Sequence, residues 1–392
     1  MIEVFTTITN SYQYSRELGL SLALFQKSLP VNSQLNLIHR TEGDASTFLI
    51  PALADRLMKG QPPEFFLILK EPSLLAGKDA VSILEHFLIQ NPGIDCVLPS
   101  DIRGVPECCH SPAYLTPRSF EAFVAGMDGL KDVVFPYDGR EPFMFLIRSR
   151  VLSNIKSVVD IFQLPKMLED RTAISQRAYI HPFFDYYMEK RADVVDMIPE
   201  SVVSLLDIGC TRGGFGSYLK SQRSCRVVGI EMNPVEGNVA RNVLDHVIIG
   251  DALQADVNGR YDCVTCLDVI EHFEEPVRLL ARIRNEFLGD KGLLVLSVPN
   301  VGHWSIVEDL LAGRWDYLPV GILCNTHLRF FTRSSITGFL AENGFRILKI
   351  VGNGVPISED MRGKYKMLAE SGMEIDFSNL DISNYLVLAE KL

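Results

Sequence analysis

Long hydrophobic runs are what this sequence most clearly lacks. No stretch of its 392 residues approaches the roughly 20 apolar residues that cross a bilayer, so no membrane span is expected. The first residues also lack a basic segment followed by an apolar one, which is the pattern of a secretory signal peptide. We therefore expect a cytoplasmic protein.

A disulfide framework is also missing. The eight cysteines follow no framework spacing, and reduced thiols, including the adjacent Cys108 and Cys109, suit a cytoplasmic protein. Cys263 and Cys266 form a C-x-x-C pair, but they lie in an apolar run that indicates a strand. Residues three apart on a strand point to opposite faces, so neither a zinc site nor a redox pair is expected there.

An excess of basic residues is absent as well. The chain has 38 Lys and Arg against 49 Asp and Glu, a formal net charge of -11. Nucleic-acid binding needs a basic face, so no nucleic-acid partner is expected. The remaining composition, 47% hydrophobic and 22% charged, is that of a globular protein long enough for two domains. It predicts no particular oligomeric state.

The sequence predicts two α/β parts joined by a connector. The first part, residues 1–155, alternates short apolar runs with helical patterns, which favours an α/β domain. Residues 156–200 are more charged and are expected to form a helical connector or cap, with an aromatic cluster at 181–187. The strands expected in the first part span 2–7, 35–39, 65–70, 96–99 and 143–147, with helices over 14–27 and 79–91.

Residues 201–392 predict a doubly wound, mostly parallel seven-stranded sheet. Five strands are separated by helices or short crossovers, and the last two form an antiparallel pair, a common ending for such a sheet. The expected strands span 202–207, 226–231, 246–249, 261–267, 292–298, 345–351 and 384–390.

A glycine-rich turn follows the first of these strands. The apolar run ends in Asp207, and Gly209 and Gly213 lie in the turn before a helix, the context in which a backbone approaches a nucleotide-like cofactor. Asp207 disfavours an anionic pyrophosphate and suits a cationic cofactor without phosphate, such as S-adenosylmethionine. Thr211 stands where a glycine is expected, so its side chain must point away from the cofactor or donate its hydroxyl to it.

From this turn onward, about residues 180–392 resemble the S-adenosylmethionine-dependent methyltransferases with a seven-stranded Rossmann-like fold. Glu231, at the end of the second strand, is suited to accept hydrogen bonds from both ribose hydroxyls, with Met232 against the adenine. The resemblance implies that Asp251 binds the adenine amino group, that Ala252 packs on the ring, and that Asp268 reaches the methionine end.

Three histidines are candidates for a general base. A methyl transfer to a hydroxyl requires alignment of the oxygen and removal of its proton, and histidine is suited to this near neutral pH. His272 follows the fourth strand, His303 follows the fifth, and His327 lies further on in the chain. His272 and His327 are the leading candidates. The segment between His303 and His327 carries aromatics that are expected to wall or cover a pocket, or to pack a helical cap.

A metal site is a further candidate. The ubiquinone-biosynthesis O-methyltransferases and the small-RNA 2′-O-methyltransferases resemble this chain in an acidic-x-x-Glu-His cluster followed by a later histidine. That resemblance implies a divalent metal held by Asp268, Glu271, His272 and His327. The chain has Asp268 where those families usually have Glu, and the shorter side chain puts this ligand in doubt.

Residues 1–155 resemble a glycosyltransferase domain of the family-2 kind. Such a domain carries an Asp-x-Asp metal motif after its central strand, where this chain reads Lys70-Glu71-Pro72-Ser73. The departure implies a degenerate, non-catalytic scaffold.

The whole sequence predicts a methyltransferase that uses S-adenosyl-L-methionine, with O-methylation of a small molecule or a sugar or glycan precursor. The alternatives are a bifunctional glycosyltransferase-methyltransferase and a non-catalytic scaffold that binds the cofactor. A dinucleotide oxidoreductase is disfavoured, because the turn does not provide Gly-x-Gly-x-x-Gly.

Overall fold

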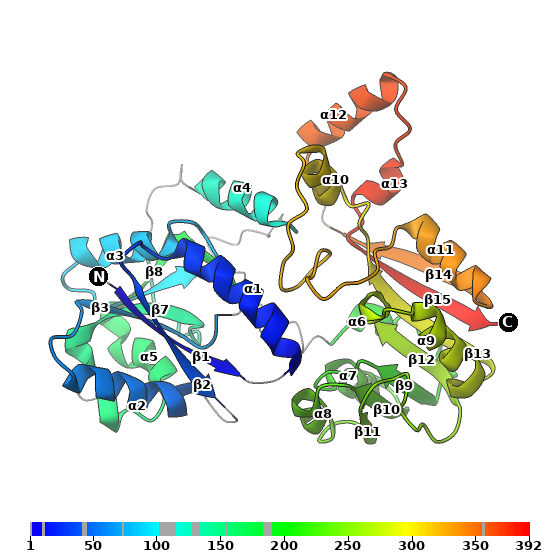
Figure 1. Cartoon of the computed structure of the whole chain (residues 1–392), viewed down its shortest axis with the longest axis horizontal. Helices are drawn as coiled ribbons and strands as arrows, with labels where there is room; N and C mark the ends of the chain where they lie inside the picture. Colours follow the sequence, from blue (N-terminus) through cyan, green and yellow to red (C-terminus); the bar gives the residue numbers. More distant parts are fainter. Residues whose placement is uncertain are drawn as a thin grey trace. The chain divides into compact units, whose positions relative to one another are not determined.

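The computed structural model describes residues 2–9, 12–40, 45–72, 74–101, 115–127, 134–153, 155–182, 190–354 and 357–392. The chain divides into two compact units, Met1–Phe184 and Asp185–Leu392, each with its own sheet (Figure 1). Each unit is therefore treated separately. No helix of the described residues is long and apolar enough to cross a membrane.

The first unit is an α/β domain built on an eight-stranded sheet. Its strands run in the order β2-β1-β3-β7-β5-β8-β4, and β6 pairs with β8. The strands are β1 (Ile2–Thr9), β2 (Gln34–Arg40), β3 (Phe65–Leu69), β4 (Leu74–Ala76), β5 (Cys96–Ser100), β6 (Val134–Pro136), β7 (Met144–Arg148) and β8 (Thr172–Pro182). The helices are α1 (Tyr12–Ser28), α2 (Ala45–Met58), α3 (Ala80–Gln90), α4 (Pro117–Met127) and α5 (Leu164–Leu168), with short 3-10 turns η1 (Ser149–Leu152), η2 (Ile155–Ser157), η3 (Ile161–Gln163) and η4 (Glu169–Arg171).

The stretch 156–200 differs from the expected helical connector. Its longest element is the strand β8, which pairs with β4, β5 and β6 and so belongs to the first sheet. Nearly every residue of β8 is buried, so the strand shows no polar alternation that would have revealed it. Of the aromatic cluster, only His181 and Pro182 belong to the described residues.

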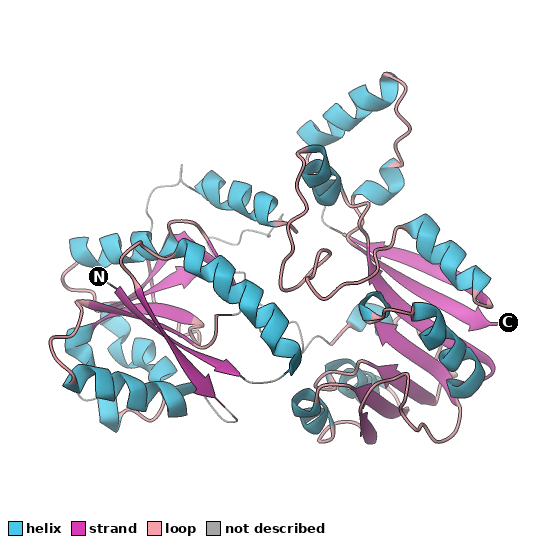
Figure 2. Ribbon diagram, viewed as in Figure 1, coloured by secondary structure: helices cyan, strands magenta, loops and turns pink. Residues whose placement is uncertain are grey.

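The second unit contains the predicted seven-stranded sheet, in the order β11-β10-β9-β12-β13-β15-β14. Figure 2 shows the strands of this sheet with helices packed beside them. Neighbours from β11 to β13 are parallel, whereas β15 is antiparallel to both β13 and β14. The strands are β9 (Ser204–Ile208), β10 (Arg226–Glu231), β11 (His246–Ile249), β12 (Tyr261–Leu267), β13 (Leu288–Pro299), β14 (Phe345–Asn353) and β15 (Asn384–Lys391).

Helices cover both faces of this sheet. The helices of this unit are α6 (Ala192–Val195), α7 (Gly214–Gln222), α8 (Pro234–Ala240), α9 (Pro276–Arg282), α10 (Trp304–Leu311), α11 (Arg333–Glu342), α12 (Glu359–Glu370) and α13 (Phe377–Leu380), with a 3-10 turn η6 (Ile270–His272) and a π-turn η7 (Ile283–Phe287). Successive residues of one strand enter different core clusters, as Leu205 and Leu206 do. Cys263 and Cys266 also lie in different clusters, in agreement with the opposite faces predicted for this pair.

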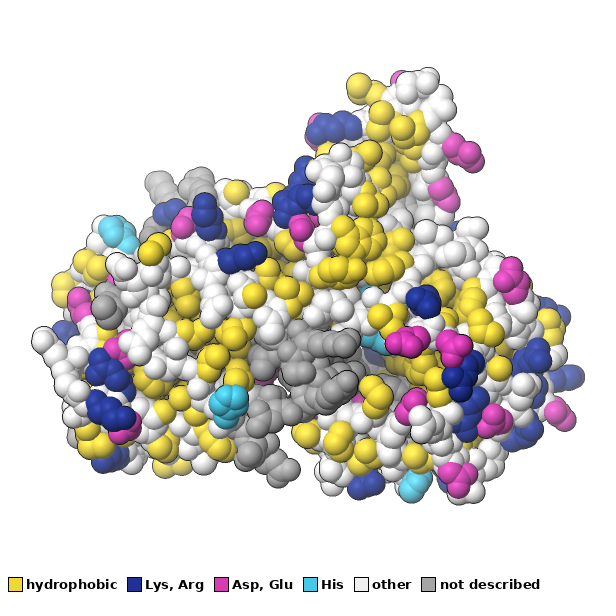
Figure 3. All heavy atoms as spheres, in the orientation of Figure 1, with side chains coloured by type: hydrophobic (Ala, Val, Ile, Leu, Met, Phe, Trp, Pro, Cys, Tyr) yellow, Lys and Arg dark blue, Asp and Glu magenta, His cyan; other side chains and the backbone are white. Residues whose placement is uncertain are grey.

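A small third layer is formed by α10, α12 and α13. Ile357, Tyr365 and Leu380 make a separate cluster, against which Trp304 packs. Hydrophobic side chains gather around α10 and the segment after it in Figure 3, where Leu311 and Tyr317 are exposed. Trp304 therefore belongs to a packed helical cap.

Candidate active site

The glycine turn connects β9 to α7 at the carboxyl edge of the second sheet. Gly209 (φ 74°) and Gly213 (φ 80°) both take the left-handed conformation that glycine tolerates. A Cβ on Gly209 would lie 2.5 Å from Cγ2 of Val269, and one on Gly216 would lie 2.9 Å from Cγ1 of Val227 in β10. The turn therefore packs closely against the segment after β12, and α7 packs closely on the sheet.

Thr211 is also left-handed, with φ 48°. A β-branched residue rarely adopts this conformation, because its Cβ approaches the following carbonyl oxygen. The Thr211 N–H donates to Oε2 of Glu231 at 2.9 Å, so the neighbouring strand β10 helps to fix this turn.

Replacing Thr211 by glycine removes the backbone strain at this position, which is expected to raise the free energy of unfolding by about 0.5 to 1 kcal/mol, apart from the loss of side-chain contacts. The left-handed conformation costs an L-residue about 1 to 2 kcal/mol, and the freedom of glycine in the unfolded chain offsets up to about 1 kcal/mol of the gain. Urea unfolding measures this change in unfolding free energy. Lys291→Gly, at another left-handed residue (φ 56°), is the matched control. A Thr211→Gly protein less stable than wild type would show that the threonine side chain itself holds the turn.

Glu231, the last residue of β10, receives two backbone donors. Its Oε1 accepts from Asn233 N–H at 2.8 Å and its Oε2 from Thr211 N–H at 2.9 Å. The side chain is buried, which raises the pKa of the carboxyl group. Each carboxylate oxygen keeps a second lone pair, so the group can still accept hydrogen bonds from a ligand.

Asp207 lies one strand away, within β9. The Thr265 hydroxyl donates to its Oδ1 at 2.7 Å. Burial raises the pKa of Asp207 to about 7, and the nearby charge of Glu231 adds to this, whereas the Thr265 hydrogen bond and Arg191 oppose it. The carboxylate therefore acquires its charge easily only when a cation is close.

The pKa of Asp207 predicts a stability that falls with rising pH. Above about pH 4 the unfolded carboxyl loses its proton, while the folded one keeps it until about pH 7. The ligand-free wild type should lose about 2 to 4 kcal/mol of unfolding free energy over this range relative to Asp207→Asn. Urea titrations at several pH values measure this, with the exposed Asp256→Asn as control. Parallel pH curves for wild type and Asp207→Asn would contradict the raised pKa.

The loop after β11 carries Asp251 and Ala252. Oδ1 of Asp251 accepts from Leu253 N–H at 2.8 Å, which makes the side chain part of a tight turn. Arg282 of α9 donates to the carbonyls of Ala252 (2.8 Å) and Ala255 (2.9 Å) and so holds the loop.

Met232 is 57% exposed beside this region. Its side chain is accessible to a planar ligand.

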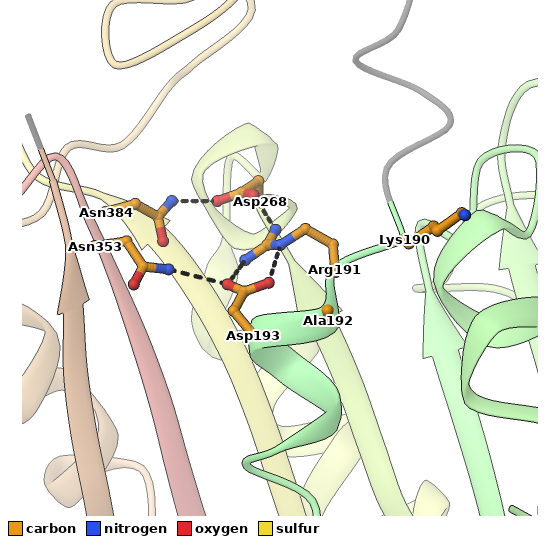
Figure 4. A pocket seen from close by; sticks show the side chains of 7 residues that line it. All are labelled: Lys190, Arg191, Ala192, Asp193, Asp268, Asn353 and Asn384. Carbon is orange, nitrogen blue, oxygen red and sulfur yellow. Dashed lines mark hydrogen bonds and ion pairs between the residues drawn. The ribbon is translucent and has the colours of Figure 1, made fainter. Parts of the chain in front are cut away.

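Asp268, directly after β12, is left-handed at φ 53° and forms an ion pair with Arg191 at 2.8 Å. Asn384 at the start of β15 donates to its other oxygen at 2.7 Å. Figure 4 shows the Arg191 guanidinium between the carboxylates of Asp268 and Asp193, which accepts from Arg191 Nε at 3.2 Å. These residues line a cavity of about 540 Å³.

Glu271, His272 and His327 form a second cluster, in which one donor atom of each lies within 4.8 Å of the others. Nδ1 of His272 lies 3.2 Å from the Thr326 carbonyl, and Nδ1 of His327 lies 3.0 Å from that of Ile322. A carbonyl accepts only, so each Nδ1 carries the proton and each Nε2 keeps a lone pair.

The pKa values of this cluster indicate two neutral imidazoles and a carboxyl group that is difficult to ionise. Burial lowers the pKa of His327 to about 4 and also lowers that of His272. Glu271 is 1% exposed, and neither of its oxygens has a hydrogen-bond partner in the described part of the chain. Burial raises its pKa well above the usual value. Such an unpaired acidic group at the centre of a site is costly without a cation.

The structure brings together three of the four predicted metal ligands, Glu271, His272 and His327, but not Asp268. Asp268 is held by Arg191 and Asn384 and is not part of the cluster that Glu271 forms with the two histidines. His303 is also placed differently from the other histidines, because its Nδ1 accepts from Ser305 N–H at 3.2 Å and caps α10. Its side chain is fully buried, which favours a structural role.

Aromatic side chains lead outward from the cluster. The rings of His272 and His327 are 4.8 Å apart, those of His327 and Phe330 are 6.4 Å apart, and those of Phe330 and Trp315 are 5.2 Å apart. Trp315 is 37% exposed at the outer end. Unlike Trp304, Trp315 and Phe330 therefore lie next to the histidine cluster.

Sequence reasoning missed Arg191, Asn353, Asn384 and Arg282. Arg191 lies directly before α6, and both α6 and β9 separate it from the glycine turn. Asn353 ends β14 and Asn384 begins β15, and no sequence motif surrounds either residue. Their roles arise from contacts between segments far apart in the chain. The C-terminal position of Asn353 on β14 and the N-terminal position of Asn384 on β15 are the signals that place both at the carboxyl edge.

The part of the chain that carries this site resembles known proteins. A family model described as "Methyltransferase domain" matches residues 177–350. The ubiquinone biosynthesis O-methyltransferase of Azorhizobium caulinodans is 26% identical over 190 residues, covering 46% of this chain and 72% of that protein. The ubiquinone biosynthesis O-methyltransferase of Leptothrix cholodnii is 32% identical over 153 residues, covering 36% of this chain and 63% of that protein.

The mitochondrial ubiquinone biosynthesis O-methyltransferase of Saccharomyces cerevisiae is 26% identical over 211 residues, and the match spans 62% of its length. Among solved structures, a SAM-dependent methyltransferase from Archaeoglobus fulgidus aligns with 53% of this chain and 98% of its own, at 19% identity and a TM-score of 0.38. The matched family model, the three O-methyltransferases and the seven-stranded sheet of Asp185–Leu392 lead to one conclusion. The C-terminal half of this chain is a class I S-adenosylmethionine-dependent methyltransferase domain.

Proposed function

We propose that this protein methylates an oxygen of a small molecule, or of a sugar or glycan precursor, with the help of a divalent cation. The observation that carries the proposal is the buried Glu271 carboxyl, which has no hydrogen-bond partner among the described residues. It lies beside two neutral histidines, with Nε2 of His327 3.9 Å from its Oε1. S-adenosylmethionine, when bound, supplies the methyl group and the sulfur leaving group. The chain's own residues have to bind the cofactor, orient the acceptor and manage its proton.

The proposed cofactor site follows the carboxyl edge from β10 to β12. Glu231 would accept hydrogen bonds from the ribose hydroxyls, since both of its oxygens keep free lone pairs. Gly209 and Gly213 let the turn approach the methionine part, and Asp207 would be ionised by the cofactor's positive charge. The adenine would lie between the exposed Met232 and the loop of Asp251 and Ala252.

Arg191 and Asp268 extend the proposed cofactor site toward its methionine end. They carry opposite charges and already form an ion pair with one another. An amino-acid head group, with its carboxylate and ammonium, matches a pair of this kind. We therefore add Arg191 to Asp268 among the proposed cofactor-binding residues.

The residues present fit a divalent metal at Glu271, His272 and His327. Each histidine presents Nε2 while its Nδ1–H is held by a backbone carbonyl, the usual outer contact of a metal-binding imidazole. A carboxylate with two imidazoles suits Mg, Mn or Zn. A cation held there would orient the acceptor and lower the pKa of its hydroxyl group.

The lowered pKa values favour metal binding over general-base catalysis for the histidines. Burial lowers the pKa of His327 to about 4, and a base with such a pKa accepts a proton weakly at neutral pH. His272 is the better base candidate, because it is less buried than His327. His303 is the weakest of the three, since its Nδ1 caps α10.

The first unit is proposed to be a non-catalytic scaffold. Lys70 follows β3, where the resembled glycosyltransferases carry a metal-binding carboxylate, and it forms an ion pair with Glu141. Asp101 after β5 is paired with Arg140. A fixed lysine ammonium at this place opposes binding of a divalent metal, which disfavours an active glycosyltransferase half.

The test of the proposed function is a transfer assay with labelled S-adenosylmethionine and Mg²⁺, Mn²⁺ or Zn²⁺. The acceptors are a panel of catechols, glycosides and nucleoside-diphosphate sugars. Formation of a methyl ether, seen as a product one methylene unit heavier, supports O-methylation. Transfer only to nitrogen or carbon acceptors would contradict it.

A further inference from the structure

A network of amide and carboxylate side chains extends from Asp268 to the far edge of the second sheet. Asn384 donates to Asp268 at 2.7 Å, and Asn353 donates to Asp193 at 3.0 Å. Arg191 joins the two pairs, donating to Asp268 at 2.8 Å and to Asp193 at 3.2 Å (Figure 4). We call Asp193, Asn353 and Asn384 the amide subsite.

Two strands fix the geometry of the amide subsite. Asn353 is the last residue of β14 and Asn384 the first of β15, and they are direct partners in the antiparallel register. Asp193 lies in the first turn of α6. The two amide side chains therefore project from adjacent strand ends of a rigid sheet.

The hydrogen bonds within the subsite leave an acceptor without a donor. The amide nitrogen of Asn384 is used by Asp268, while its Oδ1 is buried and has no partner in the described residues. A buried carbonyl oxygen without a donor is destabilising, because it has lost its hydrogen bonds to water and gained none in the protein. A ligand hydroxyl that donates to Oδ1 would remove this cost.

The lining of the cavity selects the chemical class of that ligand. Of the seven residues around its roughly 540 Å³, only Ala192 is apolar, so an aromatic or alkyl group finds no apolar contact there. Two carboxylates, Asp193 and Asp268, are balanced by Lys190 and Arg191, so a neutral ligand is favoured over a charged one. A hydroxyl both donates and accepts, which matches acceptor oxygens beside a guanidinium.

The amide subsite lies beyond the proposed cofactor residues. Asp207 and Glu231 are on β9 and β10, whereas β15 and β14 follow two and three strands after β12 in the sheet. With about 4.8 Å between neighbouring strands, β14 lies roughly 14 Å from β12. A cofactor whose methionine end meets Asp268 leaves this side of the cavity to the acceptor.

We propose that the amide subsite binds a neutral, polyhydroxylated acceptor such as a sugar ring, with one hydroxyl on Oδ1 of Asn384 and a second near Asn353. This inference rests on the proposed O-methyltransferase function, which it deepens by naming the substrate class. The subsite positions the acceptor and takes no part in the cofactor contacts.

The test compares two acceptor panels at saturating S-adenosylmethionine, with formation of S-adenosylhomocysteine as readout. One panel holds methyl glycosides of common hexoses and pentoses and their nucleoside-diphosphate forms, and the other holds catechol and simple phenols. We expect turnover with the glycoside panel. Asn353→Leu and Asn384→Ala should raise KM about tenfold or more for that acceptor, with kcat within about threefold. Asn238→Leu, an exposed asparagine on α8, is the control and should change neither constant.

Calorimetry with S-adenosylhomocysteine separates this inference from the proposed function. Unchanged cofactor affinity in Asn353→Leu, together with a raised KM, supports the subsite. Turnover confined to phenols, no turnover with any glycoside despite tight cofactor binding, or a KM that does not respond to either substitution would overturn it. Failure of the wild type to bind the cofactor at all would instead overturn the proposed function.

Discussion

Removing divalent metal with a chelator is expected to reduce methyl transfer by at least 100-fold, and adding back excess Mg²⁺, Mn²⁺ or Zn²⁺ should restore it. The expectation follows from Glu271, a buried carboxyl without a hydrogen-bond partner among the described residues, and from two neighbouring histidines whose Nε2 atoms keep their lone pairs. Without a cation the acceptor hydroxyl keeps its ordinary pKa and is poorly oriented. The assay is the rate of S-adenosylhomocysteine formation with and without chelator.

Variants of the cluster test the same expectation from the protein side. Glu271→Gln keeps the shape of the side chain but removes a charged ligand, so activity and the response to added metal should both be lost. The protein should stay folded, because no hydrogen bond of the native carboxyl is broken. Glu274→Gln, three residues away and exposed, is the matched control. Full activity in excess chelator, or a Glu271→Gln enzyme as active as wild type, would remove the metal from the account.

Truncation of Glu231 to alanine is expected to weaken cofactor binding by at least 100-fold. Hydrogen bonds to a charged group contribute about 1.5 to 3 kcal/mol each, and two ribose hydroxyls would lose their acceptor. The backbone donors of Thr211 and Asn233 lose theirs too, so the glycine turn also loosens. Titration calorimetry with S-adenosylhomocysteine measures the affinity.

Two further variants show whether the effect belongs to the ribose contact. Glu231→Gln keeps the volume, but its NH₂ group would face one of the two backbone N–H donors, so it should restore only part of the affinity. Glu275→Ala removes an exposed carboxylate and should leave the affinity unchanged. Near-wild-type binding by Glu231→Ala would show that the cofactor is held elsewhere.

Much of the second unit could be predicted because its signals are local. Strands β10, β11 and β12 begin and end at the predicted residues, since each is a short apolar run bounded by turn or polar residues. Asp207, Glu231 and Asp251 all lie within or directly after parallel strands, and the carboxyl ends of such strands share one edge. Chain order alone therefore places them together.

The contacts that the sequence did not reveal join distant segments. Asp268 is bound by Arg191 from 77 positions before it and by Asn384 from 116 positions after it, and no spacing rule connects these residues. For this reason the sequence placed Asp268 in a metal-binding set that the structure divides. The strand β8 was missed for a different reason, because a strand buried on both faces lacks the alternation on which strand prediction depends.

The measurement that tests the central claim most directly is a calorimetric titration of the full-length wild-type protein with S-adenosylhomocysteine. The geometry of Asp207, Glu231 and the glycine turn predicts one binding site per chain with micromolar affinity, lost in Glu231→Ala. No heat of binding at high micromolar ligand, from a protein that is folded by circular dichroism, would contradict the account.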